Sequence, residues 1–199
     1  MEAMFTLPYA EFCVAQQLSR LLPAKRGYRV FVPASRQEPG VDLVLAQRIR
    51  GRTRVATIQV KTSRTYNPRP AVKARNGGYV TKRSFRYYTW FSTFPCPPQA
   101  DFFTLIALYP ARDTQERREL GGWWAPQILL FTQREMRLFM RSVRTVKGKP
   151  DRMFGFGFDE PRHVYQTRGD KNRRGNDYSP HVLERRVGML RSFLRGADL

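Results

Sequence analysis

Two short apolar runs separated by a polar turn constrain this chain more than any other feature. The first run is Leu43 to Ala46, and the second extends from Val55 through Ile58 to Val60. Between them lies Arg48-Ile49-Arg50-Gly51-Arg52, whose arginines and glycine are typical of the connection in a β-hairpin. A near-continuous apolar run suits a strand that is buried on both faces. The pattern therefore predicts two neighbouring strands within a larger sheet.

Polar residues stand at the ends of these two strands. Asp42 precedes the first strand, and the second contains Gln59-Val60-Lys61. Because side chains alternate along a strand, Gln59 and Lys61 point to one face while Val60 points into the core. If the strands pair, an acid, an amide oxygen and an ammonium group meet at one end of the sheet. Metal-dependent phosphodiester cleavage needs that combination, although the local pattern also fits an ordinary hairpin with polar ends.

A helix is predicted upstream of the strands. It begins at Leu7-Pro8, where proline is tolerated in the first turn, and it runs to about Leu22. Glu11 lies four residues before Ala15, on the apolar stripe of that helix. A carboxylate on the core-facing side is costly unless it is paired or bound to a metal, which favours Glu11 as part of a metal site. The alternative is that Glu11 interacts favourably with the helix dipole.

The order of these residues resembles the PD-(D/E)XK nuclease superfamily. The resemblance rests on the helix residue Glu11, on Gly27-Tyr28-Arg29-Val30 leading into a strand, on Gly40-Val41-Asp42, and on Ile58 to Ser63. The resemblance covers about residues 5–65. Within the superfamily, the chain looks most like the small Holliday-junction resolvases and homing endonucleases. The resemblance implies a restriction-endonuclease-like core, which is an α/β fold with a mixed central sheet flanked by helices.

The resemblance also implies roles for individual residues. Asp42 matches the first acid, Gln59 the second acid, Lys61 the lysine and Glu11 the helix acid. Asp42, Gln59, Glu11 and the Val60 carbonyl would hold Mg²⁺, with Mn²⁺ possible, and Lys61 would orient the attacking water. Gln59 departs from the family pattern, because an amide oxygen is a legitimate ligand of a hard cation but brings no charge. A catalytically silent nucleic-acid-binding module of the same fold therefore stays open as an alternative.

The charge of the chain predicts a polyanionic partner. There are 36 Lys and Arg against 16 Asp and Glu, a net charge of +20. No acidic residue occurs from Thr62 to Ala100. The residues expected to bind DNA, duplex or branched, are Arg64, Arg69, Lys73, Arg75, Lys82, Arg83 and Arg86 in this segment and Arg173 and Arg174 near the C-terminus. A basic structural or ribosome-associated protein would also explain the charge, but not the ordered acid, amide and lysine.

The chain is expected to form one domain in two parts. Residues 1–143 would be the nuclease core, with a basic insertion at about 62–100, and residues 144–199 a basic extension with a terminal helix. Within the insertion, Phe85 to Phe91 is expected to form a central hairpin with buried aromatic residues. Gly155-Phe156-Gly157 is expected to interrupt regular structure in the extension.

Further elements follow from local patterns. Asp101 to Tyr109 and Trp123 to Phe131 are expected to be strands, with Asp101 a strand-end residue rather than a ligand. Thr132 and Glu135 form a capping-box pattern that opens a helix to about Val143. Ser179-Pro180 is expected to begin the terminal helix.

The remaining expectations concern compartment and assembly. Cys13 and Cys96 give no disulfide framework, no apolar run has transmembrane length, and the N-terminus lacks a signal-peptide pattern. We therefore expect a cytoplasmic protein without a membrane partner. The expected activity is that of a Mg²⁺-dependent DNA endonuclease of the restriction or homing type, or of a structure-selective nuclease. Family precedent and the geometry of double-strand cleavage favour a homodimer.

Overall fold

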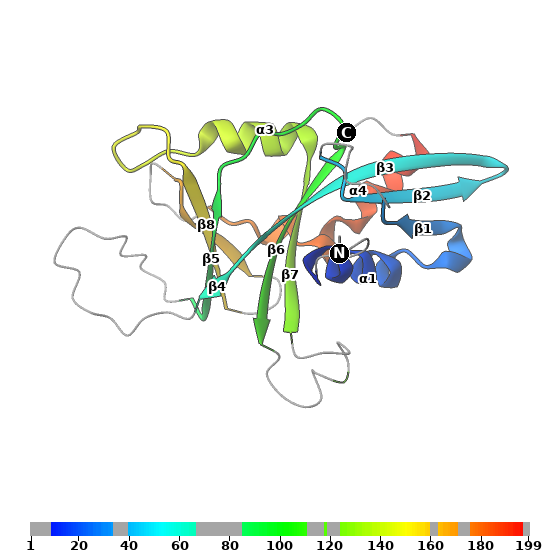
Figure 1. Ribbon diagram of the computed structural model, residues 1–199, viewed down its shortest axis with the longest axis horizontal. Coiled ribbons are helices and arrows are strands. Elements are labelled where there is room, and N and C mark those ends of the chain that lie inside the picture. The colour runs from blue at the N-terminus through cyan, green and yellow to red at the C-terminus, as the bar shows by residue number, and fades with distance from the viewer. Residues whose placement is uncertain are drawn as a thin grey trace, which may run out of the picture.

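The structure, a computed structural model, describes residues 9–33, 40–66, 85–110, 118, 124–159, 163–170 and 176–196 (Figure 1). The helices are α1 (Tyr9–Leu21), α3 (Gln133–Ser142) and α4 (Leu183–Arg195), with short 3₁₀ turns η1 (Ala24–Arg26) and η2 (Ser179–His181). The strands are β1 (Tyr28–Phe31), β2 (Leu43–Ile49), β3 (Arg52–Ser63), β4 (Thr65–Tyr66), β5 (Tyr87–Ser92), β6 (Phe102–Pro110), β7 (Trp124–Thr132), β8 (Met153–Phe158) and β9 (Val164–Arg168).

The first sheet contains the hairpin that the sequence predicts. Its order is β1-β2-β3-β6-β7, with β3 and β6 parallel and the other neighbours antiparallel. This confirms an α/β fold with a mixed sheet. The β2–β3 turn is tighter than the predicted connection, because Arg50 and Gly51 have φ values of 49° and 79° and close it as a mirror-image turn. Leu43 consequently pairs with Ile58.

Helices α1 and α4 cover one face of the first sheet. Val14 and Leu18 from α1 and Leu190 from α4 are each fully buried in one cluster with Ile58 of β3. The apolar stripe predicted for the first helix is thus the surface that packs on the sheet. Val60 belongs to the same cluster, so Gln59 and Lys61 face the opposite side of β3.

A second sheet, which the sequence did not predict, has the order β4-β5-β8-β9 and is antiparallel. The hairpin predicted for Phe85 to Phe91 is wrong, because that segment supplies the single strand β5. The expectation for Gly155-Phe156-Gly157 is also wrong, because these residues lie within β8. Alternation explains the strand: Phe154, Phe156 and Phe158 are buried on one side, and the glycines lie on the other, under aromatic rings from the β5 segment.

The second sheet packs, together with α3, on the face of the first sheet opposite α1 and α4. Phe91 and Phe156 from the second sheet share a cluster with Phe103 and Leu105 of β6 and with Phe139 of α3. In Figure 1, α3 lies across the top while β5 and β8 lie to the left of β6 and β7. The predicted basic insertion and C-terminal extension therefore meet in one sheet beside the first.

The predicted capping box of α3 is present in full. The Thr132 N–H donates to Glu135 Oε2 at 2.8 Å, and the Glu135 N–H donates to Thr132 Oγ1 at 3.2 Å. The strands predicted from Asp101 and from Trp123 correspond to β6 and β7. Among the helices in the described ranges, none has both the length and the apolar character needed to cross a bilayer.

Candidate functional site

Asp42 lies immediately before β2, against the middle of β3. Its backbone N–H donates to the carbonyl of Ile58, the residue with which Leu43 pairs, at 3.0 Å. Its carboxylate Oδ2 accepts a hydrogen bond from the Val60 N–H at 2.7 Å. Asp42 is thus bonded to the residues on either side of Gln59. The two strands thus bring the acid to the Gln59-Val60-Lys61 segment.

Gln59 is buried, and one of its polar atoms is unsatisfied. The side chain is only 7% exposed, and its Oε1 has no hydrogen-bond partner within the described part of the chain. A Cβ atom at Gly40 would collide with the ring of Pro97 and would lie 3.5 Å from Gln59 Nε2, so glycine allows this close packing. An unsatisfied buried carbonyl oxygen is costly. A cation bound at Gln59 Oε1 would remove that cost.

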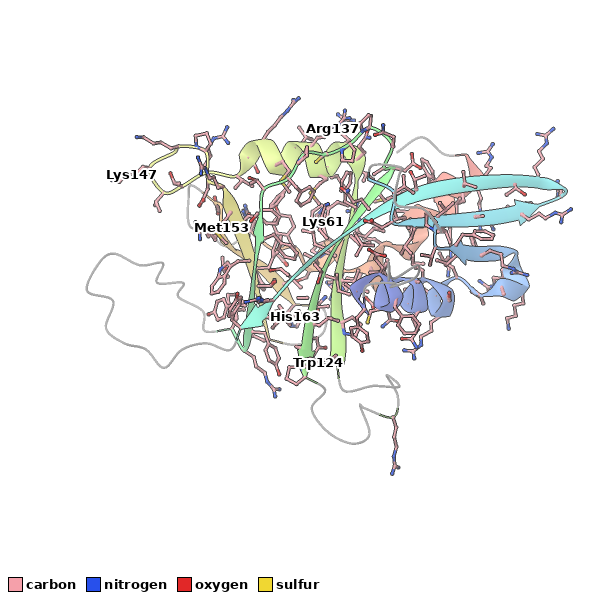
Figure 2. All side chains as sticks on the ribbon, viewed as in Figure 1. Lys61, Trp124, Arg137, Lys147, Met153 and His163 are labelled. Atoms are coloured by element: carbon pink, nitrogen blue, oxygen red, sulfur yellow. The ribbon has the colours of Figure 1, made fainter. Side chains whose placement is uncertain are left out.

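Lys61 follows on the same face of β3. Its Nζ lies 5.3 Å from the centre of the Phe94 ring, within the range of a cation–π contact. Burial raises the pKa of the Cys96 thiol, and the positive charges of Arg137 and Lys61 oppose that rise. Cys96 therefore lies near both cations. Figure 2 shows Lys61 near the centre of the molecule and Arg137 on α3 above it. The ammonium therefore contacts a residue, Phe94, that is distant in sequence, and a second cation, Arg137, lies in the same region.

The segment between β5 and β6 is anchored on both sides of the candidate site. Gln133 at the start of α3 donates through Nε2 to the carbonyls of Pro97, at 3.2 Å, and Pro98, at 2.9 Å. Thr57 of β3 donates through Oγ1 to the Gln99 carbonyl at 2.6 Å. Asp101 Oδ2 accepts from the Thr57 N–H at 2.8 Å, so Asp101 serves the strand end as predicted. These bonds hold Pro97 over Gln59.

Glu11 approaches from the other side of the sheet. It is 9% exposed on α1, whose buried residues pack with Ile58 and Val60 rather than on the face that carries Gln59 and Lys61. Within the described ranges, no three His, Cys, Asp or Glu side chains group closely enough to hold a metal ion. The structure therefore brings Asp42 to Gln59 and Val60, but it does not gather a second and third acid with them.

Two of the predicted DNA-binding residues can be placed. Arg64 follows β3 directly, Arg86 precedes β5, and both side chains are exposed. The other members of the predicted set lie outside the described residues: Arg69, Lys73, Arg75, Lys82, Arg83, Arg173 and Arg174.

A second basic region, on the β2–β3 hairpin, was missed. Its residues line a cavity of about 700 Å³ between the hairpin and the end of α4. They are Gln47, Ile49, Arg50, Arg52, Arg54, Leu194 and Arg195. Gln47 is 6% exposed, and among the described residues its Oε1 has no hydrogen-bond partner. The signal in the sequence is an arginine at every second position from Arg48 to Arg54.

The assembled oxygens can serve a hard cation. Asp42 supplies a carboxylate, Gln59 an unpartnered amide oxygen, and Lys61 a positive charge on the same strand. Comparisons with protein-family models, with curated proteins and with solved structures found no match for the chain. The geometry of these residues and the charge of the chain are therefore the features that indicate a function.

Proposed function

We propose that this protein is a Mg²⁺-dependent deoxyribonuclease that hydrolyses phosphodiester bonds in DNA. The observation that carries the proposal is the hydrogen bond from the Val60 N–H to the Asp42 carboxylate. It brings the acid to the strand that carries Lys61 and Gln59, whose Oε1 has no partner among the described residues. The resemblance to PD-(D/E)XK nucleases, with their restriction-endonuclease-like core, requires this placement of the acid against the amide and the lysine.

Asp42 and Gln59 are the residues that would hold a magnesium or manganese ion, since both offer side-chain oxygens. Glu11, which the resemblance assigns as the helix acid, lies on α1 at the other face of the sheet, so the ion would have to reach it around the strand. The Val60 carbonyl lies on the same side of the strand as the Val60 N–H, toward Asp42. When bound, Mg²⁺ would supply Lewis acidity to the phosphate and would lower the pKa of the attacking water.

The protein's own groups have separate tasks in this reaction. The Lys61 ammonium orients the attacking water and offsets the negative charge that develops on the phosphate. The contact with Phe94 limits the positions open to the lysine side chain. The hydrogen bond from Val60 fixes one carboxylate oxygen of Asp42 and leaves the other for a ligand.

The charge of the molecule supports DNA as the substrate. A net charge of +20 favours a polyanion, and each phosphate contacted makes binding more sensitive to salt. Arg64 is exposed directly after β3, the strand that carries Lys61, and Arg86 is exposed directly before β5. Cleavage of both strands of a duplex is simplest for a homodimer with two equivalent sites. Site-specific cutting of the restriction or homing type is the form that the resemblance favours, and a structure-selective nuclease is the alternative form.

A second function is favoured by one feature of the same site. Gln59 brings no charge, and the described residues show no group of three metal-binding acids, histidines or cysteines. A protein with this fold and charge but without cleavage would be a nucleic-acid-binding module. Metal dependence of cleavage separates the two functions.

The test is cleavage of supercoiled plasmid with Mg²⁺ or Mn²⁺ and with EDTA. We expect metal-dependent cutting that Lys61→Ala abolishes and that Lys147→Ala, which removes a lysine at the far left of Figure 2, leaves unchanged. Discrete fragments would establish site-specific cleavage, and cutting of branched DNA alone would establish a structure-selective nuclease. Tight, salt-sensitive binding without cutting of either substrate would contradict the nuclease and support the binding module.

A further inference from the structure

The outward face of the second sheet carries a row of aromatic rings. Tyr87 and Phe91 of β5 point inward and are buried, so Tyr88 and Trp90 point outward. Tyr66 of β4 pairs with Tyr88 and therefore shares the outward face. We call Tyr66, Tyr88 and Trp90 the aromatic ledge.

Glycines in β8 make room for rings on this face. Gly155 pairs with Trp90, and a Cβ atom at Gly155 would collide with the indole and lie 2.8 Å from the Thr89 carbonyl oxygen. Gly157 pairs with Tyr88, and a Cβ atom there would collide with the ring of Phe85. The rings of Trp90 and Phe85 therefore pack directly on the glycines of β8.

Within the aromatic ledge, the ring of Trp90 contacts the rings of both Tyr66 and Tyr88. The centres of Tyr66 and Trp90 are 4.7 Å apart with their planes inclined by 41°, and those of Tyr88 and Trp90 are 6.4 Å apart and inclined by 23°. Tyr66 is 41% exposed, which is a large fraction for an aromatic side chain already in contact with another ring. The aromatic ledge thus offers an open ring surface at Tyr66, supported from below by Trp90.

Positive charge flanks the aromatic ledge. Arg64 precedes β4 and Arg86 precedes β5, and neither forms an ion pair with any acid among the described residues. The Arg86 guanidinium lies 5.3 Å from the centre of the Tyr87 ring, so Arg64 is the cation without such a contact in the described ranges. In the sequence, residues 67–84, which link Tyr66 to the β5 segment, contain Lys and Arg but no Asp or Glu. Aromatic rings beside unpaired cations are the combination that binds unpaired nucleotides, since the rings stack on bases and the cations neutralise phosphates.

The aromatic ledge lies close to the candidate site along the chain. Ser63 at the end of β3 donates through Oγ to the carbonyl of Trp90. Lys61 lies two positions before Ser63 on the same strand, and Tyr66 lies five positions after Lys61. At about 3.3 Å per residue, that stretch of chain spans about 17 Å at most. A nucleic-acid strand held at Lys61 is therefore within reach of the aromatic ledge.

We propose that the aromatic ledge stacks unpaired bases of a DNA strand, so that the protein prefers DNA with a single-stranded flank or branch over fully paired duplex. Bases within a duplex cover each other's faces, whereas unpaired bases expose faces that aromatic side chains can stack on. The inference rests on the proposed function for the position of the cut strand, but base binding itself needs neither metal nor cleavage.

Binding in EDTA tests the inference without cleavage. The probes are a fluorescein-labelled oligothymidylate and a duplex of the same length, followed by anisotropy. We expect Tyr66→Ala to weaken binding of the single strand about tenfold. Tyr66→Phe should restore the affinity, and duplex affinity should change little in either variant. Phe31→Ala is the matched control, because Phe31 is 54% exposed on β1, far from β4 in Figure 1.

A second measurement reports on Trp90 directly and does not depend on a variant that removes its ring. In a Trp123→Phe, Trp124→Phe background, Trp90 is the remaining tryptophan. We expect oligothymidylate to quench its fluorescence and the duplex to leave it unchanged. Equal quenching by both ligands, or equal losses of affinity for both in Tyr66→Ala, would overturn the inference.

Failure of this inference and failure of the proposed nuclease give different results. Selective single-strand binding through Tyr66 without cleavage of any DNA would leave the inference standing and reject the nuclease. Metal-dependent cleavage with no effect of Tyr66→Ala on the choice between single strand and duplex would do the reverse.

Discussion

The carboxylate of Asp42 and the backbone N–H of Val60 are joined by a 2.7 Å hydrogen bond between the residue before β2 and the middle of β3. This bond takes the place of the next backbone bond of the sheet, at the point where β2 has not yet begun. The bond stabilises the fold, because it gives the Val60 N–H an acceptor. It also contributes to the candidate site, because it orients the Asp42 carboxylate. Variants at Asp42 should therefore affect both stability and cleavage.

Replacement of Asp42 separates these two effects. Asp42→Ala leaves the Val60 N–H without its acceptor, and we expect a loss of about 2 kcal/mol in the free energy of unfolding. Asp42→Asn keeps an acceptor oxygen and should lose less stability, but it removes the charge needed for metal binding. Urea unfolding and plasmid cleavage measure the two effects, and full cleavage by Asp42→Asn would remove Asp42 from the metal site.

Gln59→Glu adds the charge that the resemblance would place there. The new carboxylate would be buried, so the variant should be less stable than the native protein in EDTA. Mg²⁺ at a concentration one hundred times its dissociation constant would raise the free energy of unfolding by about 2.7 kcal/mol. We expect cleavage at lower Mg²⁺ concentrations than in the native protein. If Mg²⁺ stabilises the variant no more than the native protein, Gln59 does not face a cation.

Gly40→Ala tests the packing of Pro97 over Gln59. Gly40 has φ of 85°, a conformation that costs alanine about 1 kcal/mol, and the new methyl group would also collide with Pro97. Gly51→Ala is the matched control, since Gly51 has φ of 79° but no neighbour within 4 Å of a Cβ atom. We expect Gly40→Ala to be the less stable of the two in urea. Equal losses in the free energy of unfolding for the two variants would show that Pro97 can move to make room for the methyl group.

The Glu135–Arg186 pair predicts a dependence of stability on pH. Their side chains meet at 2.6 Å, and Arg186 also donates to the Leu130 carbonyl at 2.8 Å. Burial opposes the charge on Glu135, but the hydrogen bonds from Arg186 and Thr132 and the charge of Arg186 outweigh it and hold the pKa of Glu135 below its usual value. Because the folded pKa is lowered, this contribution is complete above pH of about 4.3 and is lost as the pH falls through the folded value.

Glu135→Gln removes that charge and keeps a side chain suited to the capping box. We expect the variant to be less stable than the native protein by about 1 kcal/mol at neutral pH, since Glu135 is partly exposed. The difference should shrink when unfolding is repeated at pH of about 3. A difference that stays constant with pH would assign the loss to packing instead of to the ion pair.

Local patterns in the sequence predicted the first sheet well. The β2–β3 hairpin follows from apolar runs and a glycine-containing turn, and α3 follows from the capping box of Thr132 and Glu135. The second sheet could not be predicted in this way. Its β5–β8 pairing joins Trp90 to Gly155, and glycine in a strand is unfavourable until the ring of a distant residue covers it.

The candidate site was likewise predictable only where it depends on local patterns. A tight turn at Arg50 and Gly51 sets the register, and the register brings Asp42, the residue before β2, to Ile58 and Val60 of β3. The surroundings of Lys61 were not predictable, because Phe94 and Arg137 come from separate elements that only the tertiary fold brings near. The aromatic ledge was missed for a similar reason, since Trp90 was expected to lie in the core and Tyr66 gains its partner from β5.

The order in which the chain visits the two sheets has a consequence for folding. After β3 the chain forms β4 and β5 in the second sheet, returns to the first as β6 and β7, and leaves again for β8 and β9. The β1–β2–β3 meander and the β6–β7 and β8–β9 pairs are local, so we expect them to form early, while β5 waits for β8. Distant pairings of this kind slow folding, and during synthesis β5 must remain unpaired on one edge until the ribosome has released β8.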